Sequence, residues 1–377
     1  MYDAIVVGAG PGGSVAAAVL AKQGIKTLLL DRDQFPREKA CGDAVQAEGF
    51  ALLREIGLTD PLPDTFFKIT HSALVSPSGK RAEFELHSVQ GEPCRVVTRY
   101  EFDELLYQYA LRCGAEAQRA HVQAPIIEDG KVIGVRIKVG KREETYSARL
   151  VIGADGATSV IARGLGVRPR AEQDRCVSLR AYVDTEATLD PTIEIAFLHA
   201  LRPGYAWFFP LSEHRANVGV GLRADAYRKT NRPLRDYLDR YLDIPYIRAM
   251  IGEHAIYDMR SWQLPLLSAR QQRVFNGALL VGDAGGFVDP LLGAGIAPAM
   301  FTGKFAAEIG AAALSEGDVS AKRLSVYDRW CDREFGTTSR IRTVMQRLVN
   351  RLPGAVDTMI RLAHLAPEPM QKLVLKG

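Results

Sequence analysis

The stretch that decides the fold is residues 4–13, which read AIVVGAGPGG. Four apolar residues predict a buried strand, and the glycines at Gly8, Gly10 and Gly13 that follow it fit the pattern G-x-G-x-x-G. We expect a helix from Ser14 to Gln23 and a second strand over 27–30. The first two glycines let the backbone approach a pyrophosphate, and the third lets helix and strand pack closely. The stretch therefore predicts a βαβ unit that binds a dinucleotide.

An acidic residue closes the second predicted strand. Asp31 lies 23 residues after Gly8, where the acceptor for a ribose 2′-hydroxyl belongs. A carboxylate at this position favours an unphosphorylated ribose. The cofactor is therefore expected to be FAD or NAD rather than NADP.

Two later segments repeat the arrangement of an apolar strand followed by a turn. They are 151–156, VIGADG, and 279–286, LLVGDAGG, and they place Asp155 and Asp283 at the carboxyl ends of predicted strands. An Asp-Gly turn alone is an ordinary loop signal. In a doubly wound sheet, however, ligands bind at the carboxyl edge of the strands. Together with the glycine-rich turn, these segments favour FAD.

The rest of the chain divides into a parallel α/β part and an antiparallel part. Alternating apolar and polar residues over 66–97 and 176–265 predict antiparallel strands, whereas 278–281 returns to a buried parallel strand and the chain beyond about 298 is helical. The expected domains are a discontinuous nucleotide-binding domain, a substrate-binding domain and a helical region. In residue numbers these are 1–65, 96–170 and 271–320, then 66–95 and 171–270, then 321–377.

The composition excludes several classes of protein. A net charge of +4 with scattered basic residues does not predict a nucleic-acid surface. Five cysteines without C-x-x-C spacing argue against both a disulfide framework and a zinc site, so we expect no metal and a reducing, cytoplasmic environment. Neither a signal peptide nor a membrane-spanning segment is expected.

The three motif segments resemble the glycine-rich, DG and GD motifs of the flavoprotein superfamily that contains aromatic hydroxylases, flavin halogenases and geranylgeranyl reductases. The resemblance implies that the ADP part of FAD binds at Gly8, Gly10, Gly13 and Asp31, with Arg32 beside them. It also implies that Asp283 lies by the ribityl chain and that Arg99 faces the flavin. For Asp155 the resemblance implies either a structural role within its motif or a contact with the ligand.

Further segments resemble the geranylgeranyl reductase family in particular. They are 35–44, FPREKACGDA; 204–210, GYAWFFP; 217–221, NVGVG; and 289–296, DPLLGAGI. The resemblance implies an α/β fold: a Rossmann-like FAD-binding domain of the GR2 type, an inserted antiparallel-sheet substrate domain and C-terminal helices. It further implies flavin contacts at Cys41, Gly42, Gly293, Gly295 and Ile296. Residue 294 is alanine where the family usually has another residue, so no substrate contact is carried over there.

The implied activity is reduction of carbon–carbon double bonds in a polyprenyl chain, by hydride from reduced FAD. Tyr205, Trp207 and Phe209 alternate, so they share one face of a strand and form either a wall for an apolar substrate or a part of the core. Cys41 is a candidate proton donor, although a lone cysteine is usually a small buried side chain. The sequence does not identify the external electron donor, which is NAD(P)H or ferredoxin.

Two other functions remain open. A halogenase has a W-x-W-x-I-P motif close to residues 205–210, but no lysine fits its catalytic role, and Lys80, near a turn, is expected to be exposed. A hydroxylase needs NAD(P)H at its flavin, yet often carries no second Rossmann motif, so the single motif here does not discriminate. A flavin-binding protein without activity is a third reading.

The C-terminal region predicts two helices. The first carries an apolar set at helical spacing, Ile341, Val344, Met345, Leu348 and Leu352, with arginines at 340, 342, 347 and 351, and the second spans 356–365. Such helices either pack on the protein's own core or lie at a membrane surface or tunnel mouth. A hydrophobic or lipid substrate would favour peripheral contact with the inner face of a membrane.

Overall fold

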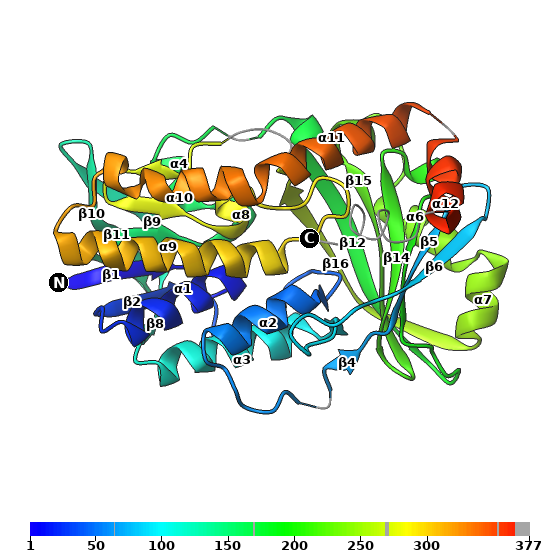
Figure 1. Cartoon of the computed structure of the whole chain (residues 1–377), viewed down its shortest axis with the longest axis horizontal. Helices are drawn as coiled ribbons and strands as arrows, with labels where there is room; N and C mark the ends of the chain where they lie inside the picture. The colour runs from blue at the N-terminus through cyan, green and yellow to red at the C-terminus, as the bar shows by residue number, and fades with distance from the viewer. Residues whose placement is uncertain (64, 169, 268–270, 353, 366–377) are drawn as a thin grey trace. The chain divides into compact units, whose positions relative to one another are not determined.

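A computed structural model describes residues 1–63, 65–168, 170–267, 271–352 and 354–365 (Figure 1). Contacts between residues divide the chain into two compact units, and each is built from three separate segments. Unit 1 comprises 1–38, 100–170 and 265–340, and unit 2 comprises 39–99, 171–264 and 341–377. Within the described ranges, no helix combines the length and the apolar character needed to cross a membrane.

Unit 1 is organised around a sheet with the strand order β17-β18-β11-β1-β2-β8, in which β18, β11, β1, β2 and β8 are parallel. β9 and β10 extend β11 as an antiparallel meander. The central strands β1 and β18 are mostly apolar because both faces of the sheet are covered there, whereas the edge strand β8 is polar. The strands are β1 (Tyr2–Val7), β2 (Thr27–Asp31), β8 (Glu116–Arg119), β9 (His121–Glu128), β10 (Lys131–Val139), β11 (Arg142–Gly153), β17 (Val274–Phe275) and β18 (Ala278–Leu280).

The helices of unit 1 pack tightly because small residues lie where they meet. A methyl group at Gly303 of α9 would lie 2.1 Å from the carbonyl oxygen of Gly12 in α1, so the two backbones touch. α10 is held on α9 by stacking of Trp330 on Phe305, with ring centroids 3.7 Å apart. The helices are α1 (Pro11–Lys22), α3 (Arg99–Arg112), α4 (Val160–Gly164), α8 (Gly282–Gly285), α9 (Ile296–Glu316) and α10 (Ala321–Glu334).

Unit 2 is organised around a seven-stranded sheet with the order β16-β12-β15-β14-β13-β5-β6. Its strand pairs are antiparallel where register is given, except that β13 runs parallel to β5. The strands are β5 (His71–Val75), β6 (Arg81–Glu85), β12 (Arg175–Thr185), β13 (Thr192–Ala196), β14 (Gly204–Ser212), β15 (Arg215–Arg223) and β16 (His254–Pro265). A small sheet joins β3 (Ala44–Val45), β7 (Arg95–Val96) and β4 (Phe67–Lys68).

One face of the large sheet is buried under two helices. α6 (Leu234–Leu242) and α7 (Pro245–Ile251) pack their apolar side chains on Val218, Val220 and Phe208. The buried carboxylate of Glu194 in β13 fastens both helices, since it accepts hydrogen bonds from the hydroxyl groups of Tyr246 (2.7 Å) and Tyr241 (3.3 Å). The opposite face of the same strands is partly covered within unit 2, where Tyr182 and Leu211 pack with Ile69, Cys94 and Val96.

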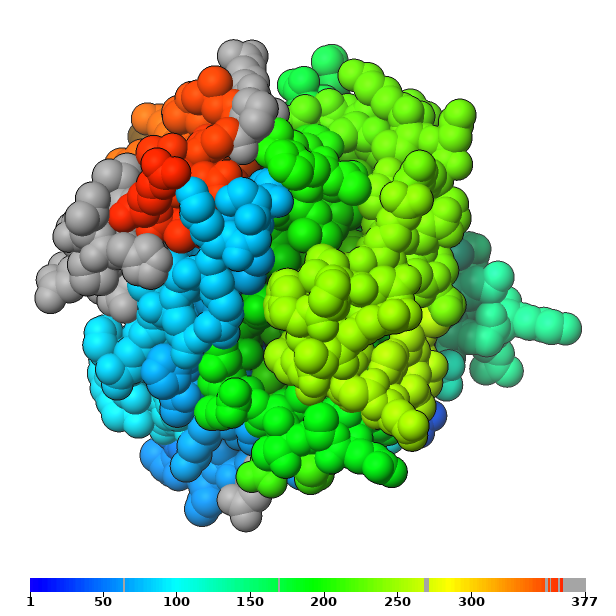
Figure 2. All heavy atoms as spheres, turned by 90° about the vertical axis from the view of Figure 1, so that its right-hand side faces the viewer, coloured from blue at the N-terminus to red at the C-terminus, as the bar shows by residue number. Residues whose placement is uncertain are grey.

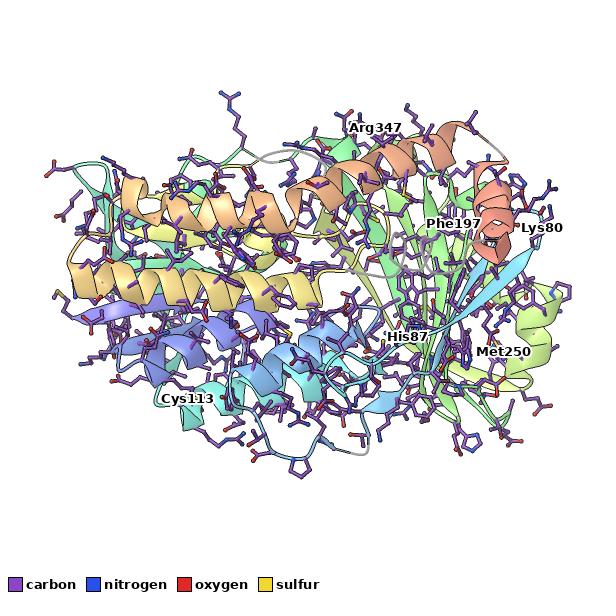
Figure 3. The ribbon with its side chains drawn as sticks, in the orientation of Figure 1. Lys80, His87, Cys113, Phe197, Met250 and Arg347 are labelled. Atoms are coloured by element: carbon purple, nitrogen blue, oxygen red, sulfur yellow. The ribbon has the colours of Figure 1, made fainter. Side chains whose placement is uncertain are left out.

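The remaining helices of unit 2 are α2 (Ala47–Glu55), α5 (Ala224–Tyr227) and α12 (Ala355–Leu365), while α11 (Gly336–Arg351) runs from unit 1 into unit 2. Figure 2 shows α12, in red, beside the light-blue β5–β6 hairpin. The hydroxyl of Ser76 donates a hydrogen bond of 2.7 Å to Asp357 of α12. Lys80 lies at the tip of the same hairpin, 42% exposed and 4.0 Å from Asp357, as expected for a solvent-facing lysine (Figure 3).

The units differ from the expected domain boundaries in several places: besides the two segments below, 96–99 falls in unit 2, unit 1 resumes at 265 rather than 271, and the chain from 341 falls in unit 2. Residues 39–65 fall in unit 2 rather than with the nucleotide-binding segments, because β3 pairs with β7 and Phe50 packs against Arg95 and Phe66. Residues 321–340 fall in unit 1 rather than in a separate helical region, because α10 packs on α9 and the Tyr327 hydroxyl donates to the carbonyl of Leu280 (3.0 Å).

α11 does not bury the apolar set that its spacing marks out. Ile341, Val344, Leu348 and Leu352 are 44–54% exposed, whereas Arg342 and Val349 are buried. The interpretation of this helix as one that packs its apolar side chains on the protein's own core is therefore wrong for those four residues. The predicted helix is correct, but the face that is buried is the one that carries Arg342 and Val349, not the one that carries the apolar set.

Candidate active site

The carboxyl ends of β1, β2, β11 and β18 lie at one edge of the unit 1 sheet, which we call the nucleotide edge. The glycine-rich turn follows β1 there, and its glycines are required by the packing. Gly8 has φ +98°, and a methyl group on it would lie 2.4 Å from the carbonyl oxygen of Ala154. A methyl group at Gly13 would lie 1.7 Å from the carbonyl oxygen of Gly8. No other residue type fits at these two positions without moving the backbone.

The N-terminus of α1 points out of this turn. Gly10 is its N-cap and makes no side-chain hydrogen bond, Pro11 follows, and the first turn contains no acidic residue. The N–H groups of the first turn and the positive end of the helix dipole therefore remain for an anion. This is the geometry that a pyrophosphate needs.

Asp31 ends β2 beside the turn. One carboxylate oxygen accepts a hydrogen bond from the N–H of Ala9 (2.7 Å), and the other accepts from the N–H of Asp33 (2.9 Å). These bonds hold the carboxylate at the edge, and each oxygen keeps a second acceptor position for a hydroxyl group. Arg32 points its half-exposed guanidinium at Asp33 instead, at 3.6 Å.

A pocket of about 220 Å³ opens at the same place. Its lining includes the stacked rings of Phe35 and Tyr107, whose centroids are 4.7 Å apart. Beyond the motif, sequence reasoning missed Tyr107, Gln118 and Arg119 as lining residues, because they come from α3 and β8. The pocket is lined by Leu29, Asp31, Asp33, Gln34, Phe35, Tyr107, Gln118 and Arg119.

Asp155 and Asp283 follow β11 and β18 at the nucleotide edge. Both oxygens of Asp155 bind its own chain: the Ser159 hydroxyl donates to one (2.5 Å), and the N–H of Val160 donates to the other (2.7 Å). These hydrogen bonds cap the N-terminus of α4, so Asp155 has a structural role here. Asp283 lies in the first turn of α8, and a methyl group on Gly295 would lie 3.6 Å from its carboxylate.

The loop between α8 and α9 is shaped by a second aspartate, to which sequence reasoning gave no role. Asp289 accepts hydrogen bonds from the N–H groups of Leu291 (2.9 Å) and Leu292 (2.7 Å) through its side chain. This folds the loop so that Gly293 takes φ +69° and Gly295 caps α9, which begins at Ile296. The predicted flavin contacts Gly293, Gly295 and Ile296 therefore lie in one loop next to Asp283.

Unit 2 carries an aromatic row on the sheet face opposite α6 and α7, in which Trp207 is buried and Phe209 packs against a small core cluster. Tyr205, Trp207 and Phe209 follow each other along β14, with ring centroids 6.2 and 6.4 Å apart. A methyl group on Gly219 of the neighbouring β15 would lie 2.1 Å from the Trp207 ring, so the indole lies across β15 at a glycine. We call these four residues, with Asn217 and Gly221, the aromatic face.

Cys41 and Gly42 lie against this face. A methyl group on Gly42 would lie 3.1 Å from the Phe209 ring and 3.5 Å from the indole nitrogen of Trp207. Cys41 is half-buried, and loss of solvent raises the pKa of its thiol, while the nearby Arg99 guanidinium acts in the opposite direction. The thiol therefore stays protonated at neutral pH.

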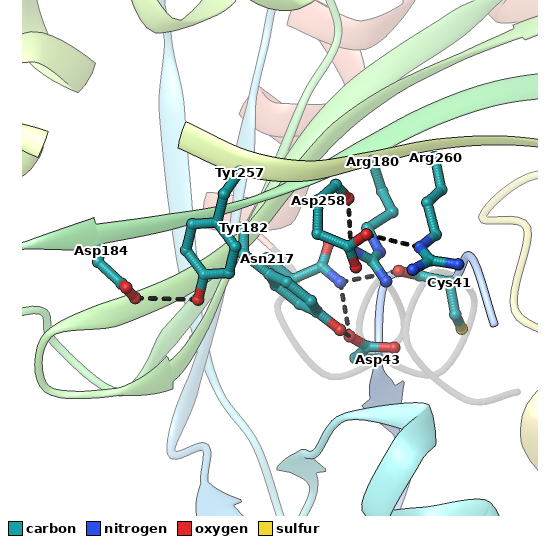
Figure 4. A network of polar contacts seen from close by, with 9 residues as sticks. All are labelled: Cys41, Asp43, Arg180, Tyr182, Asp184, Asn217, Tyr257, Asp258 and Arg260. Carbon is teal, nitrogen blue, oxygen red and sulfur yellow. Dashed lines mark hydrogen bonds and ion pairs between the residues drawn. The ribbon is translucent and has the colours of Figure 1, made fainter. Parts of the chain in front are cut away.

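Figure 4 shows a polar network around the turn that contains Cys41 and Asp43. The Asn217 amide donates to the carbonyl of Cys41 (2.7 Å) and to the carboxylate of Asp43 (2.8 Å), and the Tyr182 hydroxyl donates to the same carboxylate oxygen (2.8 Å). The Trp207 indole N–H donates to the Asn217 carbonyl (2.8 Å). Sequence reasoning quoted Asp43 and Asn217 within motifs but assigned them no role. No sequence signal marked Asp43, which stands in a segment with several charged residues, whereas Asn217 is a polar residue beside the apolar segment 218–222.

Burial raises the pKa of Asp43 to about 7, against the opposing effects of Tyr182, Asn217, Arg180 and Arg99. The buried Arg180 guanidinium lies over the Tyr182 ring, 3.9 Å from its centroid, and donates to Asp258 (2.9 Å). This part of unit 2 therefore contains a carboxyl group that takes up a proton close to neutral pH.

The nucleotide edge of unit 1 combines a glycine-rich turn, an uncapped helix N-terminus and an acid at the end of the next strand. These features define the chain as a dinucleotide-binding protein with a Rossmann-like fold, and the residues present fit FAD. The sequence matches the FAD binding domain family over residues 1–333.

Curated relatives narrow the assignment. The chain is 33% identical to digeranylgeranylglycerophospholipid reductase 1 of Methanopyrus kandleri over 345 residues, covering 89% of this chain and 88% of the relative. It is 34% identical to digeranylgeranylglycerophospholipid reductase of Methanocella arvoryzae over 372 residues, covering 96% and 90%. The chain belongs to the geranylgeranyl reductase family of FAD-dependent oxidoreductases.

Solved structures agree with this fold. A geranylgeranyl bacteriochlorophyll reductase-like protein from Thermoplasma acidophilum superposes with a TM-score of 0.88 at 25% identity, covering all of this chain and 96% of the other. A flavin-dependent brominase superposes with a TM-score of 0.78 at 22% identity, covering 96% and 92%. The latter likeness concerns the fold alone.

Proposed function

We propose that this enzyme saturates carbon–carbon double bonds in the polyprenyl chain of a lipid. The observation that carries the proposal is the aromatic face of unit 2, where Gly219 leaves room for the Trp207 indole, which meets the Tyr205 ring edge-on and is tilted against the Phe209 ring. A continuous row of rings suits an apolar chain, because it offers a large surface at little cost in side-chain entropy. The names of the curated relatives support the same substrate class.

We further propose which residues bind FAD. Gly8, Gly10, Gly13 and Asp31 would bind the pyrophosphate and ribose, with Arg32 at the rim of the same edge. Asp283, with the loop that carries Gly293, Gly295 and Ile296, would bind the ribityl chain and the ring. Cys41, Gly42 and Arg99 belong to unit 2, and their contact with the flavin stays a prediction. Bound FAD supplies the hydride, which an external donor, NAD(P)H or ferredoxin, must first provide.

The proton is the contribution of the protein itself. Addition of a hydride to one carbon of the double bond leaves the other carbon to take a proton. Cys41 Sγ is the proposed donor, because burial raises the pKa of its thiol and thus keeps a proton on it. The aromatic face would hold the chain and exclude water from this reaction.

The decisive experiment is a single turnover without oxygen. The flavin of the purified protein is photoreduced, candidate prenyl lipids are added, and products are examined by mass spectrometry for gains of two hydrogens. We expect reoxidation of the flavin that matches the hydrogens gained. No reoxidation under these conditions, together with oxygen- or halide-dependent products in air, would contradict the proposal and support a hydroxylase or halogenase.

We also propose that the C-terminal region contacts the cytoplasmic face of a membrane. The exposed side chains of Ile341, Val344 and Leu348 form a stripe along α11, Leu352 directly after the helix continues it, and Arg340 beside them is exposed as well. Figure 3 shows Arg347 on the same helix. An apolar stripe flanked by arginines matches an anionic lipid surface, which is where a polyprenyl lipid resides.

A further inference from the structure

Asn217 uses all its principal hydrogen-bonding groups inside the protein. It is wholly buried, and its two amide hydrogens are donated to Cys41 O and Asp43 Oδ2 (Figure 4). Its carbonyl oxygen accepts a hydrogen bond from the indole N–H of Trp207. If the amide were turned over, its NH2 group would face the indole N–H, so that donors would meet a donor. Its carbonyl oxygen would then face Cys41 O and Asp43 Oδ2, so that acceptors would meet an acceptor. The orientation of the amide is therefore fixed by its partners.

These three bonds join parts of unit 2 that are far apart in the sequence. Cys41 and Asp43 stand in a turn before β3, Trp207 in β14 and Asn217 in β15. Within the turn, Asp43 takes the left-handed conformation, with φ +64°, which is uncommon outside glycine, although Asp and Asn adopt it more readily than other residues. Such a conformation persists only where surrounding contacts impose it. The Asn217 and Tyr182 hydrogen bonds are contacts of that kind.

We propose that Asn217 is a positioning residue for Cys41: it ties the Cys41–Asp43 turn to the Trp207 indole, so that the thiol and the aromatic face are placed together. The proposal rests on the role of Cys41 in the proposed function. The tie acts through the backbone carbonyl of Cys41, at 2.7 Å, and not through its sulfur.

Tyr182 provides a matched control within the network. Asn217 and Tyr182 each donate one hydrogen bond to the same oxygen of Asp43, but Asn217 also binds the Cys41 backbone. A Tyr182→Phe variant therefore disturbs the Asp43 carboxylate while it leaves the tie to Cys41 in place. An Asn217→Ala variant removes both.

The charges around the turn decide the direction of the expected change. Asp43 and Arg99 act on the Cys41 thiol, and Arg180 and Arg99 act on Asp43. Arg180 in turn binds Asp258, which Arg260 also contacts. Loss of the Asn217 donor favours the neutral form of Asp43, and release of the turn admits water to the thiol. Both effects lower the pKa of Cys41 and increase its thiolate fraction.

The experiment measures iodoacetamide labelling of Cys41 in the FAD-loaded protein across pH, read peptide by peptide by mass spectrometry. We expect Asn217→Ala to label several-fold faster than wild type at neutral pH, with its profile moved towards an ordinary cysteine, whereas Tyr182→Phe, which acts on the thiol only through Asp43, should shift by a clearly smaller factor. Equal profiles for Asn217→Ala and wild type, or equal shifts in Asn217→Ala and Tyr182→Phe, would overturn the proposal.

A second variant guards against misfolding of Asn217→Ala. The double exchange Asp43→Asn with Asn217→Asp keeps one amide and one carboxylate in contact but leaves the carbonyl of Cys41 without a donor. We expect it to label as fast as Asn217→Ala. If the double variant labelled at the wild-type rate, one amide and one carboxylate in contact would be enough to position Cys41. That result would refute the role of the hydrogen bond from Asn217 to the Cys41 carbonyl. Because labelling needs neither substrate nor electron donor, its outcome is independent of whether the enzyme reduces prenyl lipids.

Discussion

At the scale of single residues, the aromatic face depends on the absence of a side chain. Trp207 lies across β15 at Gly219, where a methyl group would lie 2.1 Å from the indole and 2.5 Å from the carbonyl oxygen of Leu179. The second of these neighbours is backbone, so the site cannot expand without distorting the sheet. The Trp207 ring can therefore occupy this position only because residue 219 is glycine.

We therefore expect Gly219→Ala to lower the free energy of unfolding by about 1–3 kcal/mol, because it overpacks the sheet. Gly221→Ala is the control: it lies on the same face of the same strand, and its nearest neighbour is Cys176 Sγ at 3.4 Å. Urea unfolding of both variants checks the prediction. A Gly221→Ala variant as unstable as Gly219→Ala would show that the indole is not the cause.

Asp43 predicts a pH dependence of stability. Its pKa is about 7 when folded against 3.8 as a model value, so between about pH 4 and 7 the folded chain holds a proton that the unfolded chain has lost. Stability from this group therefore falls as pH rises through that window, by about 1.4 kcal/mol for each pH unit, and is level outside it. Asn tolerates the same backbone conformation, so Asp43→Asn should lack this dependence.

The measurement is urea unfolding of wild type and Asp43→Asn at several pH values from 4 to 8. The difference in unfolding free energy between the two proteins should move steadily in favour of the variant as pH rises. A difference that stays constant over this range would contradict the raised pKa of Asp43.

At the scale of elements, α11 shows where sequence reasoning stops. Its spacing correctly predicts a helix and which side chains share a face, because both follow from 3.6 residues per turn. It does not say which face turns inward. Arg342 is 1% exposed while Leu348 is 48% exposed, an inversion of the usual preference. Which side of α11 is covered is decided by its packing partners.

The exposed stripe makes a prediction at this scale. We expect the double variant Val344→Glu with Leu348→Glu to bind anionic phospholipid vesicles several-fold more weakly, because both side chains are about half exposed and would enter the interface. Stability should hardly change. Val326→Glu, at an exposed apolar position of α10, is the control, and vesicle co-sedimentation is the measurement. Equal losses in both would argue against α11 as the contact.

At the scale of the whole molecule, the two units differ in how far they could be predicted. The nucleotide edge follows from local motifs, since Asp31 ends its strand and Gly8, Asp155 and Asp283 come one to three residues after theirs. The network around Cys41 does not. Tyr182 and Asn217 reach it through the antiparallel register of β12 and β15, where they are directly paired, and one sequence does not reveal that register.

FAD should stabilise the protein by mass action. With free FAD at about a hundred times its dissociation constant, we expect a gain of about 2.7 kcal/mol, seen as a higher melting temperature. Asp31→Ala should lose much of this gain, because Asp31 offers the acceptor at the nucleotide edge. Asp3→Ala, at the amino end of β1 and paired with Arg149 at 3.5 Å, should keep it. Loss of the FAD effect in Asp3→Ala alone would contradict the assignment of Asp31.

The interleaving of the two units also constrains how the protein is made. β1 pairs with β11, and β11 with β18, so the first strand to leave the ribosome waits for residue 278 before its sheet is complete. β5 likewise waits for β13, about 120 residues later. Apolar strands are thus exposed during most of synthesis. We expect the nascent chain to rely on chaperones until its last third emerges.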